Sequence, residues 1–256
     1  MNAARGDGPK LSALVVARNE EARLEDCLAA LGFADELVVV LDRCTDGSKA
    51  IAERHGARVI DGAWELEGGR RNTGIDACVG DWVLEVDADE RVTPELAAEI
   101  RARIREAPFG HFLIPYDNYV GDRLVRHGWG ASWGVSATVR LFARGAKRWG
   151  CQRVHPELEL RGEAMRLEAR MVHHVDRDIS DMLKRLDHYS GARARDLRES
   201  GDIGSLAQAV RRLVSRFWKC YVLRRGYREG AYGFLIALMA GLYPVFSHLK
   251  ARLEND

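Results

Sequence analysis

Between residues 11 and 106, short apolar runs alternate with longer segments that carry apolar residues at helical spacing. The runs that suit strands are residues 11–16, 37–41, 57–60 and 81–86, and the segments that suit helices are 20–31, 45–54, 68–79 and 93–106. Asn19 and Thr93 are placed to cap the first and last of these helices. Strands that alternate with helices in this way form a parallel sheet with helices on both faces. The sequence therefore predicts an α/β fold.

Polar clusters follow three of the predicted strands directly, and they are Arg18-Asn19-Glu20, Asp42-Arg43 and Asp87-Ala88-Asp89. The carboxyl ends of parallel strands meet at one edge of a sheet, where ligands bind in open α/β folds. We therefore expect the three clusters to converge on one crevice.

Two carboxylates, Asp87 and Asp89, close the last of these strands. In an extended backbone, residues two apart point to the same side, so both carboxylates can face one point. Hard oxygen ligands of this kind suit Mg²⁺ or Mn²⁺ that also holds a diphosphate. The alternative is an acidic turn before the next helix.

No glycine-rich phosphate loop of the Rossmann or P-loop type occurs in the sequence. Charge that balances a diphosphate must therefore come from a metal or from side chains. Arg70 and Arg71, followed by Asn72, supply the second option because a guanidinium group suits phosphate oxygens. A solvated helix face is the alternative for this pair.

Beyond residue 110 the pattern changes to strand-like runs at 111–116, 123–127, 138–143 and 167–175, joined by loops that contain Gly and Trp. We expect them to extend the sheet in mixed orientation and to wall off a second substrate site. From residue 179 the chain is predicted to be helical. The predicted division is a domain at 10–178, with halves at 10–110 and 111–178, and a helical region at 179–256.

Composition and charge narrow the class of protein. The net charge is +1, which gives no general argument for nucleic acid binding. Five scattered cysteines without a C-x-x-C pair favour a reducing compartment, and residues 1–10 lack an apolar signal core. These features predict a cytoplasmic protein.

The carboxyl-terminal region combines positive charge with an apolar stretch. Residues 181–228 hold twelve Lys and Arg against five Asp and Glu, and residues 231–249 carry no formal charge apart from His248. As a helix this stretch would extend about 28 Å, close to the hydrocarbon thickness of a bilayer. Interfacial attachment to an anionic cytoplasmic leaflet, a membrane span and a buried helix all remain open.

Four ordered motifs resemble those of family 2 glycosyltransferases: residues 14–20 (LVVARNE), 41–48 (LDRCTDGS), 71–74 (RNTG) and 86–90 (VDADE). The resemblance implies a GT-A-type mixed sheet with a Rossmann-like nucleotide-binding half. Later segments, at 126–128, 140–142, 153–155, 172–174 and 232–234, are similar to a bacterial subgroup that includes β-glucosyltransferases of the lipopolysaccharide core.

The resemblance implies an inverting transfer of a hexose from a nucleotide-sugar, most often a UDP-sugar. Nucleoside contacts fall on Ala17, Asn19 and Glu20, and Asp42 bonds the base. Arg71 lies near the diphosphate, Asp87 positions sugar and nucleotide, and Asp89 ligates the metal that offsets charge on the leaving diphosphate. Together with the residues proposed on their own chemistry, the full set of candidate substrate-binding residues is Ala17, Arg18, Asn19, Glu20, Asp42, Arg70, Arg71, Asn72, Asp87 and, through its indole face, Trp129.

A general base must take the proton of the acceptor hydroxyl. The subgroup implies Glu directly after the histidine of R-x-V-H, but this chain has Pro156 there and Glu157 next. Glu157, with His155 beside it, is the candidate base, and an exposed strand residue is the alternative. His173 or His155 is a candidate to complete the metal shell, or a packed strand residue. Trp129, Trp133 and Trp149 are either an acceptor platform or core.

The sequence therefore predicts a glycosyltransferase at the inner face of the cytoplasmic membrane, with a lipid-linked glycan such as lipopolysaccharide core as acceptor. A polyprenyl-phosphate glycosyltransferase and a nucleotide-binding scaffold without turnover are the alternatives. The sequence leaves the sugar, the linkage and the oligomeric state undetermined.

Overall fold

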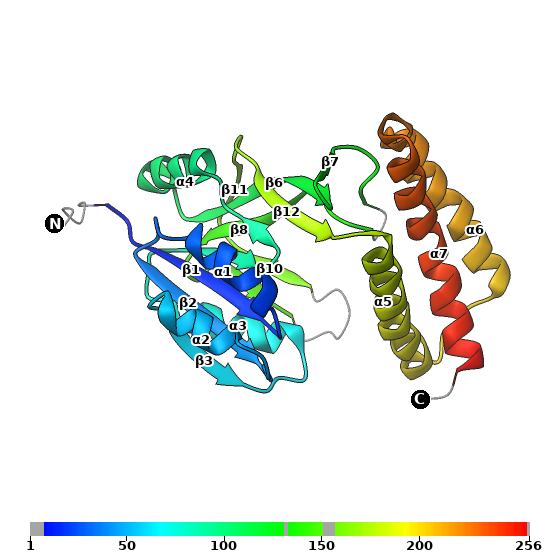
Figure 1. The fold of residues 1–256 in the computed structure, drawn as a ribbon, viewed down its shortest axis with the longest axis horizontal. Coiled ribbons are helices and arrows are strands. Elements are labelled where there is room, and N and C mark those ends of the chain that lie inside the picture. Colours follow the sequence, from blue (N-terminus) through cyan, green and yellow to red (C-terminus); the bar gives the residue numbers. More distant parts are fainter. Residues whose placement is uncertain (1–7, 131–132, 151–156, 255–256) are drawn as a thin grey trace. The chain divides into compact units, whose positions relative to one another are not determined.

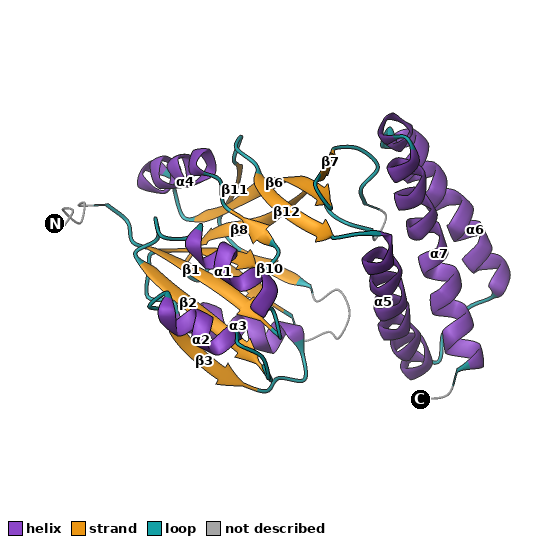
Figure 2. Cartoon of the chain, in the orientation of Figure 1, coloured by secondary structure: helices purple, strands orange, loops and turns teal. Residues whose placement is uncertain are grey.

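The computed structural model describes residues 8–130, 133–150 and 157–254, and its contacts divide the chain into two units (Figures 1 and 2). The first unit comprises residues 1–115 and 137–172, and the second comprises 116–136 and 173–256. Strands β6 (Gly110–Val120) and β12 (Met171–Asp176) pass from one unit into the other.

The first unit contains a mixed sheet. Besides parts of β6 and β12, this unit contains β1 (Leu11–Ala17), α1 (Glu21–Ala29), β2 (Glu36–Asp42), α2 (Ser48–Arg54), β3 (Arg58–Gly62), α3 (Glu67–Ala77), β4 (Trp82–Asp87), β5 (Glu90–Arg91), α4 (Pro94–Glu106), β8 (Ala137–Ala143), β9 (Lys147–Trp149), β10 (Leu158–Leu160) and β11 (Glu163–Arg166). The strand order in this unit is β3-β2-β1-β4-β8-β6. β1 to β4 are parallel, whereas β8 is antiparallel to both β4 and β6. The predicted mixed orientation is therefore confirmed.

Burial explains the central position of β1. All seven of its residues are buried, as expected for a parallel strand covered on both faces. α4 begins as predicted, because the Thr93 hydroxyl accepts a hydrogen bond from the Leu96 N–H at 3.2 Å and Pro94 occupies the first turn. Strands β9 and β11 were not predicted, since they are only three or four residues long and lack an apolar pattern, whereas β10 follows Glu157 where an exposed strand was one of the alternatives.

The second unit is mainly helical. It contains β7 (Arg123–Val125), α5 (Ile179–Ser200), α6 (Leu206–Trp218), a π-helical turn (Lys219–Leu223), a 3₁₀ turn (Gly226–Glu229) and α7 (Ala231–Leu253). α7 packs against both α5 and α6. Its apolar side forms a core with residues of the segment 116–136, including Val120, Val125, Trp129 and Trp133. This shared core is why the unit includes residues 116–136, which the sequence analysis assigned to the sheet domain.

α7 is the single described helix long and apolar enough to cross a membrane, and 56% of its most apolar stretch is buried. Two glycines on it mark close approaches. A Cβ at Gly233 would lie 1.8 Å from the Gly226 carbonyl oxygen, and a Cβ at Gly241 would lie 3.0 Å from the Leu213 carbonyl oxygen. α7 is therefore the packing centre of the helical unit.

Gly233→Ala should destabilise the protein by about 1–3 kcal/mol, because the added methyl group overlaps the 3₁₀ turn. Gly191→Ala is the matched control on α5, where a Cβ would lie 3.7 Å from the nearest atom, the Lys250 Nζ. The control should be neutral or slightly stabilising, since Ala favours a helix. Urea unfolding checks both variants, and equal stabilities would contradict the close approach.

Candidate active site

Three strands of the first unit end at the same edge of the sheet. In the registers of β1 with its neighbours, Ala17 lies opposite Leu41 of β2, and Val16 lies opposite Asp87 of β4. The clusters that begin at Arg18, Asp42 and Asp87 therefore share this edge, and their predicted convergence is confirmed.

Hydrogen bonds join the loops that follow β1 and β2. Asn19 has a positive φ of 56°, and its side-chain oxygen accepts from the Thr45 N–H at 2.8 Å. The Glu20 N–H donates to the Ser48 hydroxyl at 3.1 Å. The prediction that Asn19 caps α1 is wrong: Glu20 occupies the cap position without a side-chain bond, because Asn19 serves the neighbouring loop. The adjoining Arg18 is exposed, whereas Ala17 is buried.

Asp42 is buried at the end of β2 and surrounded by donors. Its carboxylate accepts from the Trp64 N–H at 3.1 Å, from the Arg43 Nε at 3.0 Å and from the Arg70 Nη1 at 3.3 Å. Burial opposes ionisation, but Arg43 and the Trp64 N–H outweigh it and lower the pKa of Asp42. Asp42 is therefore held as an ionised acceptor.

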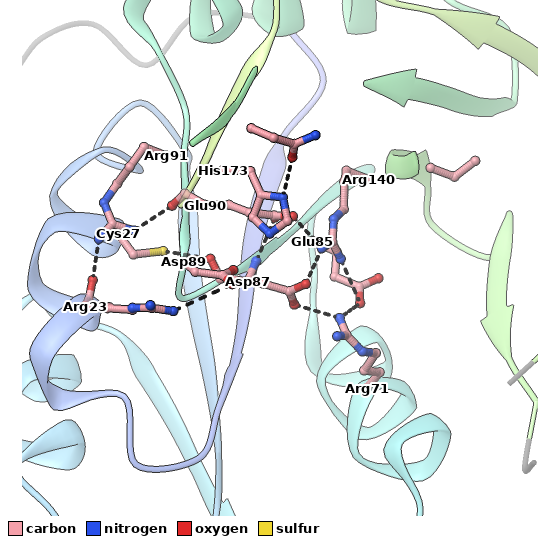
Figure 3. A network of polar contacts seen from close by, with 12 residues as sticks. Arg23, Cys27, Arg71, Glu85, Asp87, Asp89, Glu90, Arg91, Arg140 and His173 are labelled. Atoms are coloured by element: carbon pink, nitrogen blue, oxygen red, sulfur yellow. Dashed lines mark hydrogen bonds and ion pairs between the residues drawn. The ribbon is translucent and has the colours of Figure 1, made fainter. Parts of the chain in front are cut away.

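Two arginines form ion pairs with Asp87 at the end of β4 (Figure 3). The Arg71 Nη1 of α3 lies 3.0 Å from Asp87 Oδ1, and the Arg140 Nη2 of β8 donates to Oδ2. The Asp87 N–H donates to the Glu90 carboxylate at 2.9 Å, and the other oxygen of Glu90 accepts from Arg140 at 2.6 Å. Asp87 is thus fixed from both sides.

A second carboxylate, Glu85, lies two residues earlier on β4 and is fully buried. It accepts from Arg71, from the Lys147 Nζ at 2.7 Å and from the Trp149 Nε1 at 3.2 Å. Arg71 also lies over the Trp149 ring, 4.9 Å from its centroid. Buried charges persist only when they are paired, and Glu85 supplies that pairing for both cations.

The positive charge around the two carboxylates controls their ionisation. Burial alone would raise the pKa of Glu85, but Lys147, Arg71 and Arg140 outweigh it and lower the pKa to about 2. For the same reason, Arg140 and Arg71 overcome burial and hold the pKa of Asp87 well below its usual range. Both groups are therefore anions at any physiological pH.

Asp89 differs from Asp87 in its surroundings. β4 ends at Asp87, and Ala88 and Asp89 form a turn, so the extended geometry that would aim both carboxylates at one point does not continue to Asp89. The Asp89 carboxylate is 27% exposed and lies 3.8 Å from the Arg23 Nη1 of α1. The two aspartates thus contact different arginines, contrary to the predicted shared orientation.

Glu20, Asp87 and Asp89 nevertheless lie close enough for their negative charges to interact. The pKa of the Glu20 carboxyl is raised by burial, and the nearby charges of Asp89 and Asp87 raise it further against the opposing effect of Arg23. Among the described residues, no group of three or more His, Cys, Asp or Glu could hold a metal ion. A divalent ion at this edge would therefore need substrate phosphate oxygens and water to complete its shell beside any protein carboxylate.

Asn72 and Arg70, two other predicted binding residues, differ in whether their side chains have hydrogen-bonding groups left for a ligand. Both side-chain polar atoms of Asn72 bond the Trp149 backbone, at 2.9 Å and 3.0 Å, so Asn72 connects α3 to β9. The Arg70 Nε is buried and has no hydrogen-bond partner among the described residues. Asn72 therefore has a structural role, and Arg70 keeps a donor for a ligand beside Asp42.

Glu157 lies on the hairpin of β9 and β10. Its carbonyl oxygen accepts from the Gly150 N–H at 2.8 Å, and the next residue, Leu158, pairs with Trp149. The exposed Glu157 is therefore adjacent in sequence to the residue that pairs with Trp149, and Trp149 contacts Glu85 and Arg71. His155 lies outside the described residues.

Two further candidates belong to the second unit. Trp129 is 4% exposed within the apolar core, and its Nε1 donates to the Val125 carbonyl oxygen at 2.7 Å. Its indole face is therefore covered, contrary to the prediction that it binds substrate. The His173 Nδ1 lies 2.8 Å from the Asn118 Oδ1, and its ring packs 5.2 Å from that of Tyr116.

The residues that brace Asp87 were not predicted as site residues. Glu85, Arg140 and Lys147 are charged positions inside or beside apolar strands, and all three are buried. A charge in a strand predicted to be buried on both faces is the signal that indicates such a network. It does not identify the partner, because Arg140 lies 53 residues from Asp87 and Lys147 lies 62 residues from Glu85 in the sequence.

The described geometry gives one sheet edge that holds fixed anions and the arginines that pair with them. The family model for glycosyl transferase family 2 matches residues 12–146, which is more than half of the chain. The chain belongs to this family. The enzyme is thus a glycosyltransferase, and its mixed α/β sheet confirms the predicted GT-A-type fold.

This glycosyltransferase is similar to two bacterial glycosyltransferases in sequence and to a solved synthase in structure. An uncharacterized glycosyltransferase of Rickettsia felis is 26% identical over 90% of this chain and 85% of the relative. The lipopolysaccharide core biosynthesis glycosyltransferase LpsC of Rhizobium meliloti is 24% identical over 94% of this chain and 91% of the relative. Glucosyl-3-phosphoglycerate synthase from Mycobacterium tuberculosis, solved with Mn²⁺, UDP and glucosyl-3-phosphoglycerate, has a TM-score of 0.37 and 23% identity, covering 44% of this chain and 45% of that chain.

Glu85→Gln should lower the free energy of unfolding by about 3–5 kcal/mol at neutral pH, because it leaves the buried Lys147 without its counter-charge and removes one of the carboxylates that pair with Arg71. The folded-state pKa of Glu85 is depressed, so its contribution is present above the ordinary value of 4.5 and is lost as the pH falls toward about 2. The difference between variant and parent should shrink over this range. Glu163→Gln, at an exposed position of β11, is the matched control and should be neutral. Unfolding by urea at several pH values provides the measurement, and a pH-independent difference would contradict the network.

Proposed function

We propose that this enzyme transfers a hexose, with inversion, from a UDP-sugar to a lipid-linked glycan such as lipopolysaccharide core. The observation that carries the proposal is the meeting of Asp42, Asp87 and Asp89 at one sheet edge in a family 2 glycosyltransferase. Similarity to LpsC along nearly the whole chain supports a glycan acceptor of the bacterial envelope.

The nucleoside is proposed to bind between the loops after β1 and β2. Asp42 is a fixed anion that accepts hydrogen bonds from the base, and the buried Arg70 Nε is a donor beside it. A ligand that bonds this nitrogen would remove the cost of an unsatisfied buried polar group, which is about 1–3 kcal/mol. The bonds between the loops after β1 and β2 hold these loops together without the ligand.

Asp87 and Asp89 are proposed to have separate roles. Asp87, gripped by Arg71 and Arg140, is an oriented acceptor for sugar or ribose hydroxyls, and its ion pairs leave it poorly suited to a metal. Asp89, a partly exposed acid in the turn after β4, would hold Mg²⁺ or Mn²⁺. When bound, such an ion offsets negative charge on the leaving diphosphate.

Glu157 is proposed as the general base. The acceptor oxygen attacks the anomeric carbon while its proton passes to the Glu157 carboxylate, and the bond from that carbon to the diphosphate oxygen breaks with release of UDP. A single displacement of this kind inverts the anomeric configuration. The exposure of Glu157, on the hairpin that carries Trp149, supports this role.

Glu157→Gln should lower kcat by about 100-fold or more, because an amide cannot take the proton. Donor binding should remain, as measured by thermal shift with UDP-sugar. Glu159→Gln is the matched control, an exposed acid two residues further along the same hairpin. If Glu157→Gln turns over near the parent rate, another residue is the base.

Asp89→Asn should lower kcat/KM by about 100-fold and raise the Mn²⁺ concentration needed for half-maximal transfer, since it removes the proposed metal ligand. Asp26→Asn changes an exposed acid of α1 and serves as control. Transfer measured across a Mn²⁺ titration, with and without chelator, checks the prediction. Undiminished activity in excess chelator would exclude the metal role.

A further inference from the structure

α6 has an apolar face that no described residue of its unit covers. Ala209 is its one buried residue, and its inner side faces α7. On the outer side Leu206, Val210, Val214 and Trp218 recur every four residues and are 49%, 46%, 62% and 57% exposed. A spacing of four keeps them on one stripe of the helix. We call these four residues the α6 stripe.

The apolar surface continues past the end of α6. Leu223, Tyr227 and Phe234 are 67%, 51% and 49% exposed. Ring contacts connect Tyr227 and Phe234 to the helix: Phe217 stacks on Tyr221 at 5.4 Å, and the Tyr221 ring lies 6.5 Å from Tyr227 and 6.2 Å from Phe234. Exposed apolar side chains gathered in this way mark an interaction site.

The segment that carries this surface is positively charged and contains no acid. Residues 203–228 contain seven Lys and Arg and no Asp or Glu. Arg211 and Arg212 on α6, Lys219 after it, and Arg225 and Arg228 beyond are all exposed. The segment therefore combines an apolar stripe with unbalanced cations.

The combination of an apolar stripe and unbalanced cations favours a bilayer over a second copy of the chain as the partner of this surface. A symmetric pair through the α6 stripe would bring the same cations together, and like charges repel. An anionic bilayer neutralises them while it accepts the apolar side chains. Trp218 and Tyr227 also suit the depth of lipid headgroups, where amphipathic rings concentrate.

α7 is less suited to this role. It is the more apolar helix, but its buried side forms the core of the unit with α5 and α6. Drawing it into a bilayer would dismantle that core, whereas the α6 stripe is already exposed.

We propose that α6 lies in the plane of an anionic membrane surface, with the α6 stripe among the acyl chains and the flanking arginines at the headgroups. The inference deepens the proposed function, since it names the surface that brings the enzyme to a lipid-linked acceptor. It assigns membrane attachment to α6 and not to the residue 231–249 stretch.

Sedimentation of the full-length protein with vesicles tests the proposal without donor or acceptor. Vesicles of phosphatidylcholine with phosphatidylglycerol should bind the protein, vesicles of phosphatidylcholine alone should bind it weakly, and high salt should reduce binding because it screens the cations. Val214→Asp combined with Trp218→Asp should weaken binding by about tenfold or more. Arg211→Glu combined with Arg212→Glu should act in the same direction.

Two matched controls lie on α5. Leu183→Asp changes a side chain that is 50% exposed, and Arg195→Glu reverses an exposed cation. Both should bind vesicles like the parent, and circular dichroism should report equal helix content for all variants. Vesicle binding that survives both α6 double variants would overturn the proposal. So would a dimer that dissociates in Val214→Asp/Trp218→Asp while no vesicle binding is seen.

Transfer to a detergent-solubilised acceptor is measured separately, because it does not require the α6 stripe. Loss of vesicle binding with full transfer in detergent supports the α6 assignment. An absence of transfer by a parent protein that binds vesicles would count against the proposed function and leave the membrane surface intact.

Discussion

The charge pairing beneath the end of β4 is the interaction on which the active-site edge depends. Glu85 is fully buried, and it lets Arg71 and Lys147 remain charged inside the unit. Arg71 then reaches Asp87 from α3, and Arg140 reaches it from β8. Elements distant in sequence are thereby joined at one carboxylate, because none of these charges can be buried without its partners.

This arrangement connects stability with donor binding. A carboxylate held by two guanidinium groups loses little orientational freedom when a substrate arrives, so the proposed contact of Asp87 with hydroxyl groups would need little reordering. Asp89 lies in the turn after β4, and the arginine near its carboxylate is Arg23 of α1. The two acids of one short motif therefore have different electrostatic surroundings, which is the physical reason for giving them separate roles. The helical unit adds a surface of another kind, apolar and cationic, on α6.

The sequence predicted much of the fold because its local signals are strong. The apolar run of β1, the Thr93 cap and the polar clusters after three strands all lie where they were expected. The errors arose where a side chain had a non-local partner. Asn19 bonds the Thr45 loop in place of capping α1, and Trp129 packs into the helical core in place of facing a sugar.

By itself, the sequence determined the family, the parallel half of the sheet and the edge where its acids gather, because motif order and hydrophobic periodicity are local properties. The tertiary structure alone decided which arginines hold Asp87, why Glu85 is tolerated in a buried strand, and which helix keeps an apolar face exposed. These outcomes depend on pairings between residues far apart in the chain, and only folding establishes which charges and which apolar side chains become neighbours.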